Sequence, residues 1–422
     1  MASRPASASG ALTGLAGVAA LAGATLLLRD WLEPSHIKAL AVLGIAAAAM
    51  IAVEVALYRT HRNAGAGLAL APLRPLDWRR VGCKVIGLWL SCGLAAAPYW
   101  VIPEFARDFF QPFRAAALFV LPGLLIISPI YVAYVDRRQH EPEDAYAQLG
   151  ALLLGRAPAD TALLWAHARG WAIKAFFLPL MFVYVTADLG GLWSAPLLPA
   201  TLDFEHVFPR LIDLLYLIDV FLATIAYALT LRPLDSHIRS AEPALAGWVV
   251  CLICYPPLNT ITGRILPYDQ DGLFWDKVFA PYPVLYALWG TAILILVAIY
   301  AGSTAAFGLR FSNLTHRGII TSGPYRWSKH PAYLSKNLTW WMISMPFVAG
   351  AGWAQAAQSC LLLGGVNLIY LLRARTEERH LSRDPVYRDY AAFIAEHGLL
   401  ANIRKAIAGM GVRLAARLRS PA

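Results

Sequence analysis

A series of long apolar stretches constrains the fold of this chain more than any other feature. A membrane-spanning helix needs about 20 largely apolar residues. Charged residues make up only 15% of the chain, whereas soluble domains average about 25%. We therefore expect an all-α, polytopic integral membrane protein with about ten membrane helices. The stretches lie near residues 11–28, 37–57, 81–103, 114–135, 170–189, 210–231, 243–262 and 281–306, with a further pair near 338–350 and 353–372.

The last two stretches differ from the others because the first of them, near 338–350, is too short to cross a bilayer alone. Pro346, Gly350 and Gly352 lie between the two stretches, and these residue types favour a turn. We expect the pair to form a tight helical hairpin.

The basic residues sort to one side of this arrangement. If the N-terminus is inside, most of the 36 Lys and Arg residues fall in the inner connections and in the tail from residue 373 onward. Basic loops mark the cytoplasmic side of membrane proteins, so both termini and the late polar segments are expected in the cytoplasm. The net charge of +10 is then explained by topology, and no nucleic-acid partner is expected.

The N-terminal stretch is expected to be a first membrane helix rather than a signal peptide, because it is long and a second apolar stretch follows at once. Abundant Ala, Arg and Pro favour the inner (plasma) membrane of a bacterium. The five cysteines form no disulfide framework. Cys251 and Cys254 make a CxxC without a second pair or a nearby His, so we expect no metal site.

Two polar segments follow the long apolar part of the chain. In residues 307–337, Gly323 and Pro324 set a turn, and Pro331 pushes His330 out of the helical conformation, so backbone groups are free to hold a ligand. An aromatic belt at a membrane interface uses similar residues, and this interpretation stays open. The turn is surrounded by basic and aromatic side chains: Tyr325, Arg326, Trp327, Lys329 and Tyr333.

The second polar segment, residues 371–390, carries pairs of opposite charge. If it is helical, Arg373 lies four residues before Glu377 and Arg375 lies three before Glu378. A surface helix with ion pairs is one interpretation. The adjacent glutamates repel one another, however, unless cations or a bound ligand compensate them.

Taken together, the two segments resemble the isoprenylcysteine carboxyl methyltransferases and their relatives, the phospholipid methyltransferases. The resemblance covers about residues 300–400, and Lys329 stands where the family usually has Arg. The first segment matches the family pattern at His316, Ile319, Ile320, Thr321, Gly323, Tyr325, His330, Pro331 and Tyr333. The second matches it at Arg375, Thr376, Glu377, Glu378, Tyr387 and Tyr390.

The resemblance implies S-adenosyl-L-methionine as the methyl donor. A carboxylate or phosphate acceptor is already anionic and needs no general base. We therefore expect O-methylation of an anionic group on a lipid, isoprenoid or prenylated substrate that enters from the bilayer. As catalytic residues, Arg326 or Lys329 is expected to help hold that anion, and His316 could serve as the base if the acceptor were an amine. The expected cofactor-binding residues are Gly323, Tyr325, His330, Pro331, Tyr333, Arg375, Glu377, Glu378, Tyr387 and Tyr390.

This interpretation divides the chain at a change of composition near residue 300. Residues 1–300 are expected to form a multi-span region with an acceptor-binding part, 301–400 the cofactor-binding and catalytic region, and 401–422 a basic cytoplasmic tail. Two other classes stay open: a transporter or lipid flippase with a methyltransferase-like tail, and a sterol-reductase-like NADPH reductase. The Glu-Glu pair and the His-Pro turn favour the methyltransferase.

Polar side chains inside the apolar stretches are a further functional signal, because charge within a bilayer is costly. Glu54 and Lys84 are candidates for a structural ion pair between neighbouring helices. Asp219 is a candidate for lining an acceptor cavity. The full set is Glu54, Lys84, Asp213, Asp219, Asn259 and Asn367.

Overall fold

The computed structural model describes residues 3–31, 35–196, 201–270, 273–348, 350 and 352–408. These residues are largely helical, and their two strands, β1 (Ser240–Ala241) and β2 (Thr315–His316), form a short antiparallel pair. The all-α class is confirmed, whereas a total of about ten spans and cytoplasmic termini stay predictions. Within the described residues, seven helical segments are long and apolar enough to cross a membrane: Ser35–Leu57, Trp78–Val101, Asp108–Asp136, Thr161–Ser194, Phe204–Ala228, Pro283–Arg310 and Trp353–Leu381.

Two compact units make up the chain, and they do not follow the chain order. The N-terminal unit comprises Ser9–Trp248 and Phe307–Gly318, and the C-terminal unit comprises Met1–Ala8, Val249–Ala306 and Ile319–Ala422. The chain thus enters the N-terminal unit again at Phe307 and leaves it after Gly318. The functional regions expected at 1–300, 301–400 and 401–422 stay predictions.

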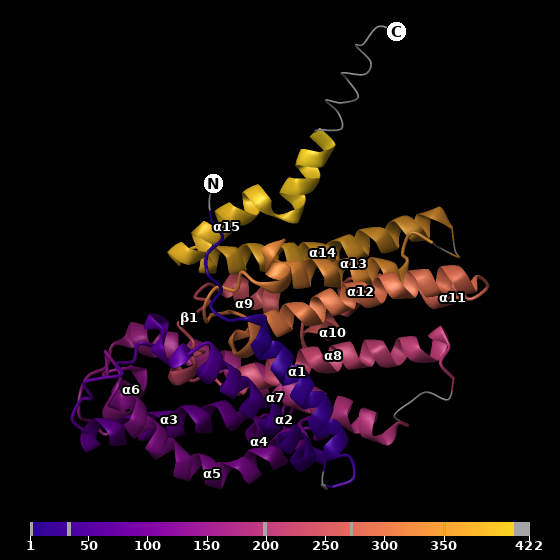
Figure 1. Cartoon of the computed structure of the whole chain (residues 1–422). Helices are drawn as coiled ribbons and strands as arrows, with labels where there is room; N and C mark the ends of the chain where they lie inside the picture. Colours follow the sequence, from indigo (N-terminus) through magenta and orange to yellow (C-terminus); the bar gives the residue numbers. More distant parts are fainter. Residues whose placement is uncertain are drawn as a thin grey trace. The chain divides into compact units, whose positions relative to one another are not determined.

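Helices of the N-terminal unit pack in pairs, with α1 on α2, α3 on α6 and α7 on α8 (Figure 1). The backbones of α3 and α6 approach so closely that glycine is needed at two positions. A Cβ on Gly87 would overlap the carbonyl of Tyr146, and a Cβ on Gly150 would overlap the carbonyl of Cys83. Small residues permit this close approach in membrane helices. The helices are α1 (Ala11–Leu27), α2 (Ser35–Ala52), α3 (Trp78–Ala96), α4 (Pro98–Val101), α5 (Gln111–Asp136), α6 (Ala145–Leu153), α7 (Thr161–Ser194) and α8 (Phe204–Ala228).

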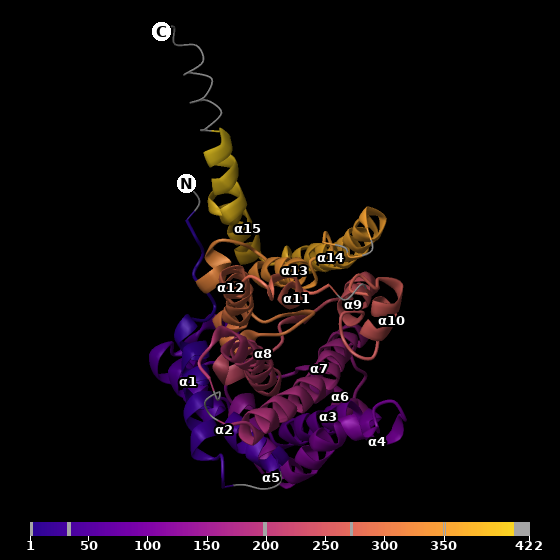
Figure 2. The ribbon, with the colours of Figure 1, turned by 90° about the vertical axis from the view of Figure 1, so that its right-hand side faces the viewer.

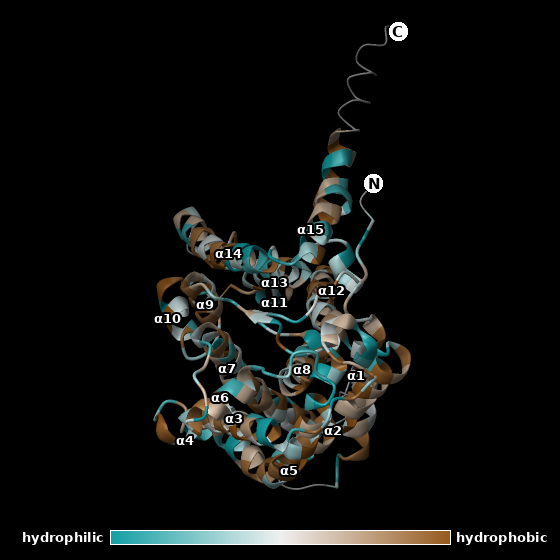
Figure 3. Ribbon diagram, turned by 90° about the vertical axis from the view of Figure 1, so that its left-hand side faces the viewer, coloured by the Kyte–Doolittle hydropathy of each residue, from teal (hydrophilic) through white to brown (hydrophobic). Residues whose placement is uncertain are grey.

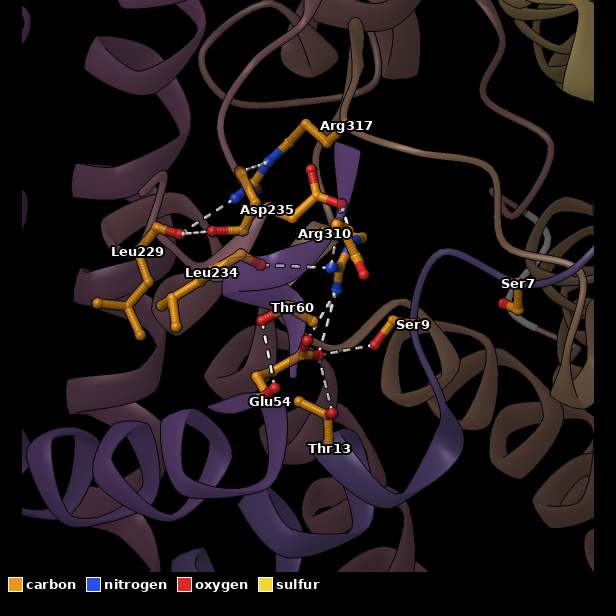
Figure 4. Close-up of polar contacts among 12 residues, drawn as sticks. Ser7, Ser9, Thr13, Glu54, Thr60, Leu229, Leu234, Asp235, Arg310 and Arg317 are labelled. Carbon is orange, nitrogen blue, oxygen red and sulfur yellow. Dashed lines mark hydrogen bonds and ion pairs between the residues drawn. The ribbon is translucent and has the colours of Figure 1, made fainter. Parts of the chain in front are cut away.

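A buried ion pair joins Glu54, in the π-helical turn Val53–Leu57 after α2, to Arg310 of the Phe307–Gly318 segment (Figure 4). The two side chains are 3.1 Å apart and neither is exposed. Ser9 and Thr13 each donate a hydrogen bond to Glu54 Oε1 at 2.8 Å. Arg310 also donates to the Leu234 carbonyl. This network fastens the late segment to the start of the unit.

The ion pair expected between Glu54 and Lys84 is therefore wrong. Lys84 lies instead 3.0 Å from Asp136 and 3.3 Å from Asp144. The physical reason is packing: α3 lies against α5 and α6, which carries Lys84 to the end of α5 and the start of α6. Asp219 is buried on α8.

In the C-terminal unit, α13 and α14 lie side by side and form the expected hairpin (Figures 1 and 2). Trp341 donates to Asn367 Oδ1 at 2.7 Å, and Asn367 donates to Asn337, so polar side chains join the two helices. The unit contains α9 (Leu245–Leu252, which enters from the N-terminal unit), α10 (Asn259–Ile265), α11 (Trp275–Phe279), α12 (Pro283–Phe307), α13 (Pro331–Ser344), α14 (Trp353–Leu381) and α15 (Pro385–His397).

Helix boundaries differ from the expectation, and two of the differences affect the C-terminal unit most. The stretch near 243–262 is not one span, because α9 ends at Leu252 and α10 begins at Asn259, with Pro256 and Pro257 between them. Proline has no N–H to donate and interrupts the helical hydrogen bonds. Conversely, α14 continues past residue 372 to Leu381, so most of the second polar segment extends a candidate span.

Candidate functional site

Most of the predicted site residues meet at four elements of the C-terminal unit. These are the 3-10 turn Gly323–Arg326, the start of α13, the last turns of α14, and α15. Side chains at the start of α13, on α14 and on α15, together with Tyr255 between α9 and α10, form a group that we call the carboxylate cluster. Its members are Tyr255, Lys329, His330, Tyr333, Tyr370, Arg373, Glu377, Glu378 and Tyr387.

The His-Pro pair builds the start of α13. Pro331 occupies the first helical position, where its missing N–H is no loss, and His330 caps the helix in a non-helical conformation. The Ser328 hydroxyl accepts the His330 N–H at 3.2 Å. One turn into the helix, the Tyr333 ring stacks on the His330 ring, with centroids 5.3 Å apart and planes at 4°.

Both adjacent glutamates are compensated from the α13 side. Glu378 Oε1 accepts from His330 Nε2 at 2.9 Å and lies 2.7 Å from Lys329 Nζ. Glu377 Oε2 accepts from the Tyr333 hydroxyl at 2.8 Å. Lys329, His330 and Tyr333 thus offset the repulsion that the sequence implies, and they hold both carboxylates in place.

Arg373 rather than Arg375 joins this cluster. The Arg373 side chain is buried, and its guanidinium lies 5.0 Å from the Tyr333 ring centroid, 5.5 Å from that of Tyr255 and 5.7 Å from that of Tyr370. Arg375 is exposed on α14 and makes none of these contacts. Residues two positions apart on a helix point in directions that differ by about 200°. Arg373 and Arg375 therefore cannot lie on one face of α14.

Tyr255 and Tyr370 are not in the predicted set. Tyr370, Arg373 and Glu377 recur at intervals of three and four residues, which is the signal of a shared helix face. It becomes visible once α14 is known to continue to Leu381. Tyr255 carries no comparable signal, because it lies in a stretch expected to be a continuous membrane helix.

The two α15 tyrosines have different surroundings. Tyr390 donates its hydroxyl to the carbonyls of Tyr325 at 2.7 Å and Ser328 at 3.1 Å, so it fastens the Gly323–Arg326 turn to α15. Tyr387 is 5% exposed, and its hydroxyl has no hydrogen-bond partner among the described residues. Burial, and then the charges of Glu378 and Glu377, raise the pKa of Tyr387, so the hydroxyl stays protonated.

The backbone conformation of the Gly323–Arg326 turn requires glycine at position 323. Its φ is +60°, and a Cβ at this position would lie 3.0 Å from the Ala306 Cβ. Glycine adopts this conformation without a steric penalty. The expected cofactor role of Gly323 stays a prediction beside this structural one, and the same holds for buried Tyr325.

The three expected catalytic residues lie in different places. Lys329 is bound to Glu378. Arg326 is exposed, with its guanidinium 5.6 Å from the Trp327 ring centroid. His316 belongs to the N-terminal unit, where it stands opposite Ser240 in the strand pair. The catalytic roles of all three stay predictions.

These features define a helical protein with segments long and apolar enough to cross a membrane and with a polar site at the ends of its last helices. Residues 284–383 match the model of the Isoprenylcysteine carboxyl methyltransferase (ICMT) family, which confirms the resemblance of the C-terminal quarter. The match includes α13 and α14 and ends before α15. The family domain and the apolar helices indicate a membrane methyltransferase. Comparisons with curated proteins and with solved structures found no match.

Proposed function

We propose that the chain is an S-adenosyl-L-methionine-dependent methyltransferase that O-methylates a carboxylate or phosphate of a lipid or prenylated substrate. One observation carries the proposal beyond the family match: the buried Tyr387 hydroxyl lacks a partner among the described residues. Buried hydroxyls are nearly always hydrogen-bonded. A polar ligand atom beside Tyr387 satisfies this requirement.

The cluster has the donor set that the methyl donor needs. The cofactor carries an ammonium, a carboxylate, ribose hydroxyls and a flat adenine, and when bound it supplies an electrophilic methyl group. Glu377 and Glu378 are acceptors for ammonium or hydroxyl groups. Arg373 is a cation held among the rings of Tyr255, Tyr333 and Tyr370 at the same face. These residues therefore fit the group in charge and in hydrogen-bonding character.

The surroundings of His330 favour an anionic acceptor. Its Nε2 donates to Glu378 at 2.9 Å, and its Nδ1 lies 3.9 Å from Glu377 Oε2. With both nitrogens facing carboxylates of the cluster, neither nitrogen points to a space where an acceptor would bind, so His330 is poorly placed as a base for an amine acceptor. An anionic acceptor needs no base. Because Lys329 already neutralises Glu378, exposed Arg326 is the stronger candidate for holding the acceptor anion.

The distribution of basic residues supports a position of this site on the cytoplasmic side of the membrane. The acceptor would then be an amphipathic lipid or isoprenoid that reaches the site from the bilayer.

Calorimetric titration of the full-length protein in phosphatidylcholine nanodiscs tests the donor. We expect S-adenosyl-L-methionine to bind. Tyr387→Phe should lower the affinity for it by about fivefold, which corresponds to the loss of one hydrogen bond of about 1 kcal/mol. Tyr282→Phe makes the same chemical change at an exposed side chain and should leave the affinity unchanged.

Titration with NADPH separates the competing classes. Binding of NADPH without S-adenosyl-L-methionine would indicate a reductase, and binding of neither would favour a transporter or flippase. A reaction with extracted membrane lipids, followed by mass spectrometry for a product heavier by one CH₂ group, then identifies the acceptor.

A further inference from the structure

A large cavity in the N-terminal unit has no role in the proposed methyl-donor site. Its volume is about 1130 Å³, and residues of α3, α5, α6, α7 and the segment 228–241 line it. Ligand sites for small molecules range from about 300 to 1,000 Å³, so the space suffices for a ligand of that size or larger. Asp219 does not line this cavity.

Lys174 of α7 is a lining cation without a matching carboxylate. Its Nζ donates to the Thr230 hydroxyl at 2.7 Å and lies 4.6 Å from the Trp171 ring centroid. None of the carboxylates in the described parts of the chain forms an ion pair with it. Lys84 lines the same cavity but is paired with Asp136 and Asp144. A cation in a membrane span is costly without a counter-charge, so Lys174 is placed to receive an anion.

His237 provides a second and independent observation in the same cavity. Its Nδ1 is buried and has no hydrogen-bond partner within the described residues. Burial, followed by the positive charges of Arg232, Arg239, Arg317 and Arg310, lowers the pKa of His237 to about 3. The imidazole is thus neutral, and its surroundings are electropositive. A neutral N–H at Nδ1 can donate to an anion there.

The lining acids do not cancel this charge. Asp144 is engaged by Lys84 and by the Gln139 amide. Glu141 and Glu143 are exposed to solvent, where their charges are screened. The acids therefore leave Lys174 and the Nδ1 of His237 without an anionic partner among the described residues, and both face the cavity.

The wall formed by α5 is apolar and open. Phe119, Val120 and Ile127 line the cavity and are 59%, 45% and 64% exposed. They belong to a segment that is long and apolar enough to cross a membrane, and the apolar character of α5 is visible in Figure 3. This wall continues into a surface suited to hydrocarbon chains.

We infer that this cavity binds an amphipathic anion, with its carboxylate or phosphate at Lys174 and His237 and its hydrocarbon chain along α5. All of these residues belong to the N-terminal unit, so the inference does not rest on the methyl-donor site. Loss of one binding activity without the other distinguishes the two proposals.

Three probes test the inference on the full-length protein in phosphatidylcholine nanodiscs: palmitate, hexadecanol and inorganic phosphate. We expect palmitate to bind at least about tenfold more tightly than either of the others, because a charge-assisted hydrogen bond contributes about 1.5–3 kcal/mol. Equal affinity for palmitate and hexadecanol, or equal affinity for palmitate and phosphate, would overturn the inference.

Variants of Lys174 locate the head group. Lys174→Met should lower the affinity for palmitate by about tenfold or more. Lys174→Arg keeps the charge, and its affinity for palmitate should stay within about threefold of that of the natural protein. Lys405→Met removes an exposed lysine that does not line the cavity, and it should leave the affinity for palmitate unchanged. If Lys174→Met does not fold, a photoreactive palmitate decides instead: labelling of α5 or α7 supports the site, and labelling confined to other elements refutes it.

Discussion

The ion pair between Glu54 and Arg310 gives a quantitative test of how the Phe307–Gly318 segment is held. Glu54→Gln keeps the side-chain shape, and its amide oxygen can still accept from Ser9 and Thr13. It removes the only full negative charge within 3.5 Å of the Arg310 guanidinium among the described residues; the next, that of Asp235, is 3.9 Å away. The variant therefore isolates the effect of charge from that of packing.

The expected loss follows from the burial of both groups. Breaking a fully buried pair by removing one partner typically costs about 3–5 kcal/mol, because the other charge remains buried. Asp235 partly compensates Arg310, and the hydrogen bonds from Ser9 and Thr13 survive. We therefore expect Glu54→Gln to lower the free energy of unfolding by about 3 kcal/mol. Adding Arg310→Met removes the unpaired buried charge. The double variant should therefore lose only about 1 kcal/mol of the free energy of unfolding relative to the natural protein.

Equilibrium unfolding in mixed micelles with increasing sodium dodecyl sulfate measures these free energies. Glu205→Gln at an exposed position is the matched control and should stay within about 0.5 kcal/mol of the natural protein. The reasoning is refuted if Glu54→Gln costs less than about 1 kcal/mol, or if the double variant is less stable than the single one.

Two further predictions concern the candidate site and the cavity. Tyr390→Phe should lower the free energy of unfolding by about 1–2 kcal/mol because two carbonyls lose their donor, whereas Tyr387→Phe should leave it unchanged; equal losses in the same unfolding assay would contradict this. The pKa of His237 is lowered to about 3 in the folded protein, against about 6.5 when unfolded. The unfolded state thus binds the extra proton, and acidification from about pH 7 to pH 5 should destabilise the protein by up to about 2 kcal/mol. His237→Gln should reduce that dependence, and an unchanged pH profile would exclude His237 as its source.

Much of the candidate site could be predicted because its signals are local. The His-Pro turn at the start of α13 and the two glutamates near the end of α14 were both expected, and hydrogen bonds join them. The choice between Arg373 and Arg375 could not be predicted without knowing that α14 continues past residue 372. The direction of a helical side chain changes by about 100° per residue, so the arginine that faces Tyr333 depends on which face of α14 packs.

The apolar stretches by themselves determined a helical membrane protein, since the length of a hydrophobic run is a property of consecutive residues. Only the tertiary structure decided the partners of the buried charges. Glu54 and Arg310 are far apart in the sequence, and many cations of similar chemistry could have met that carboxylate. The cavity at Lys174 likewise has residues from several helices. Side chains distant in the chain meet according to how the helices pack, and hydropathy does not record that packing.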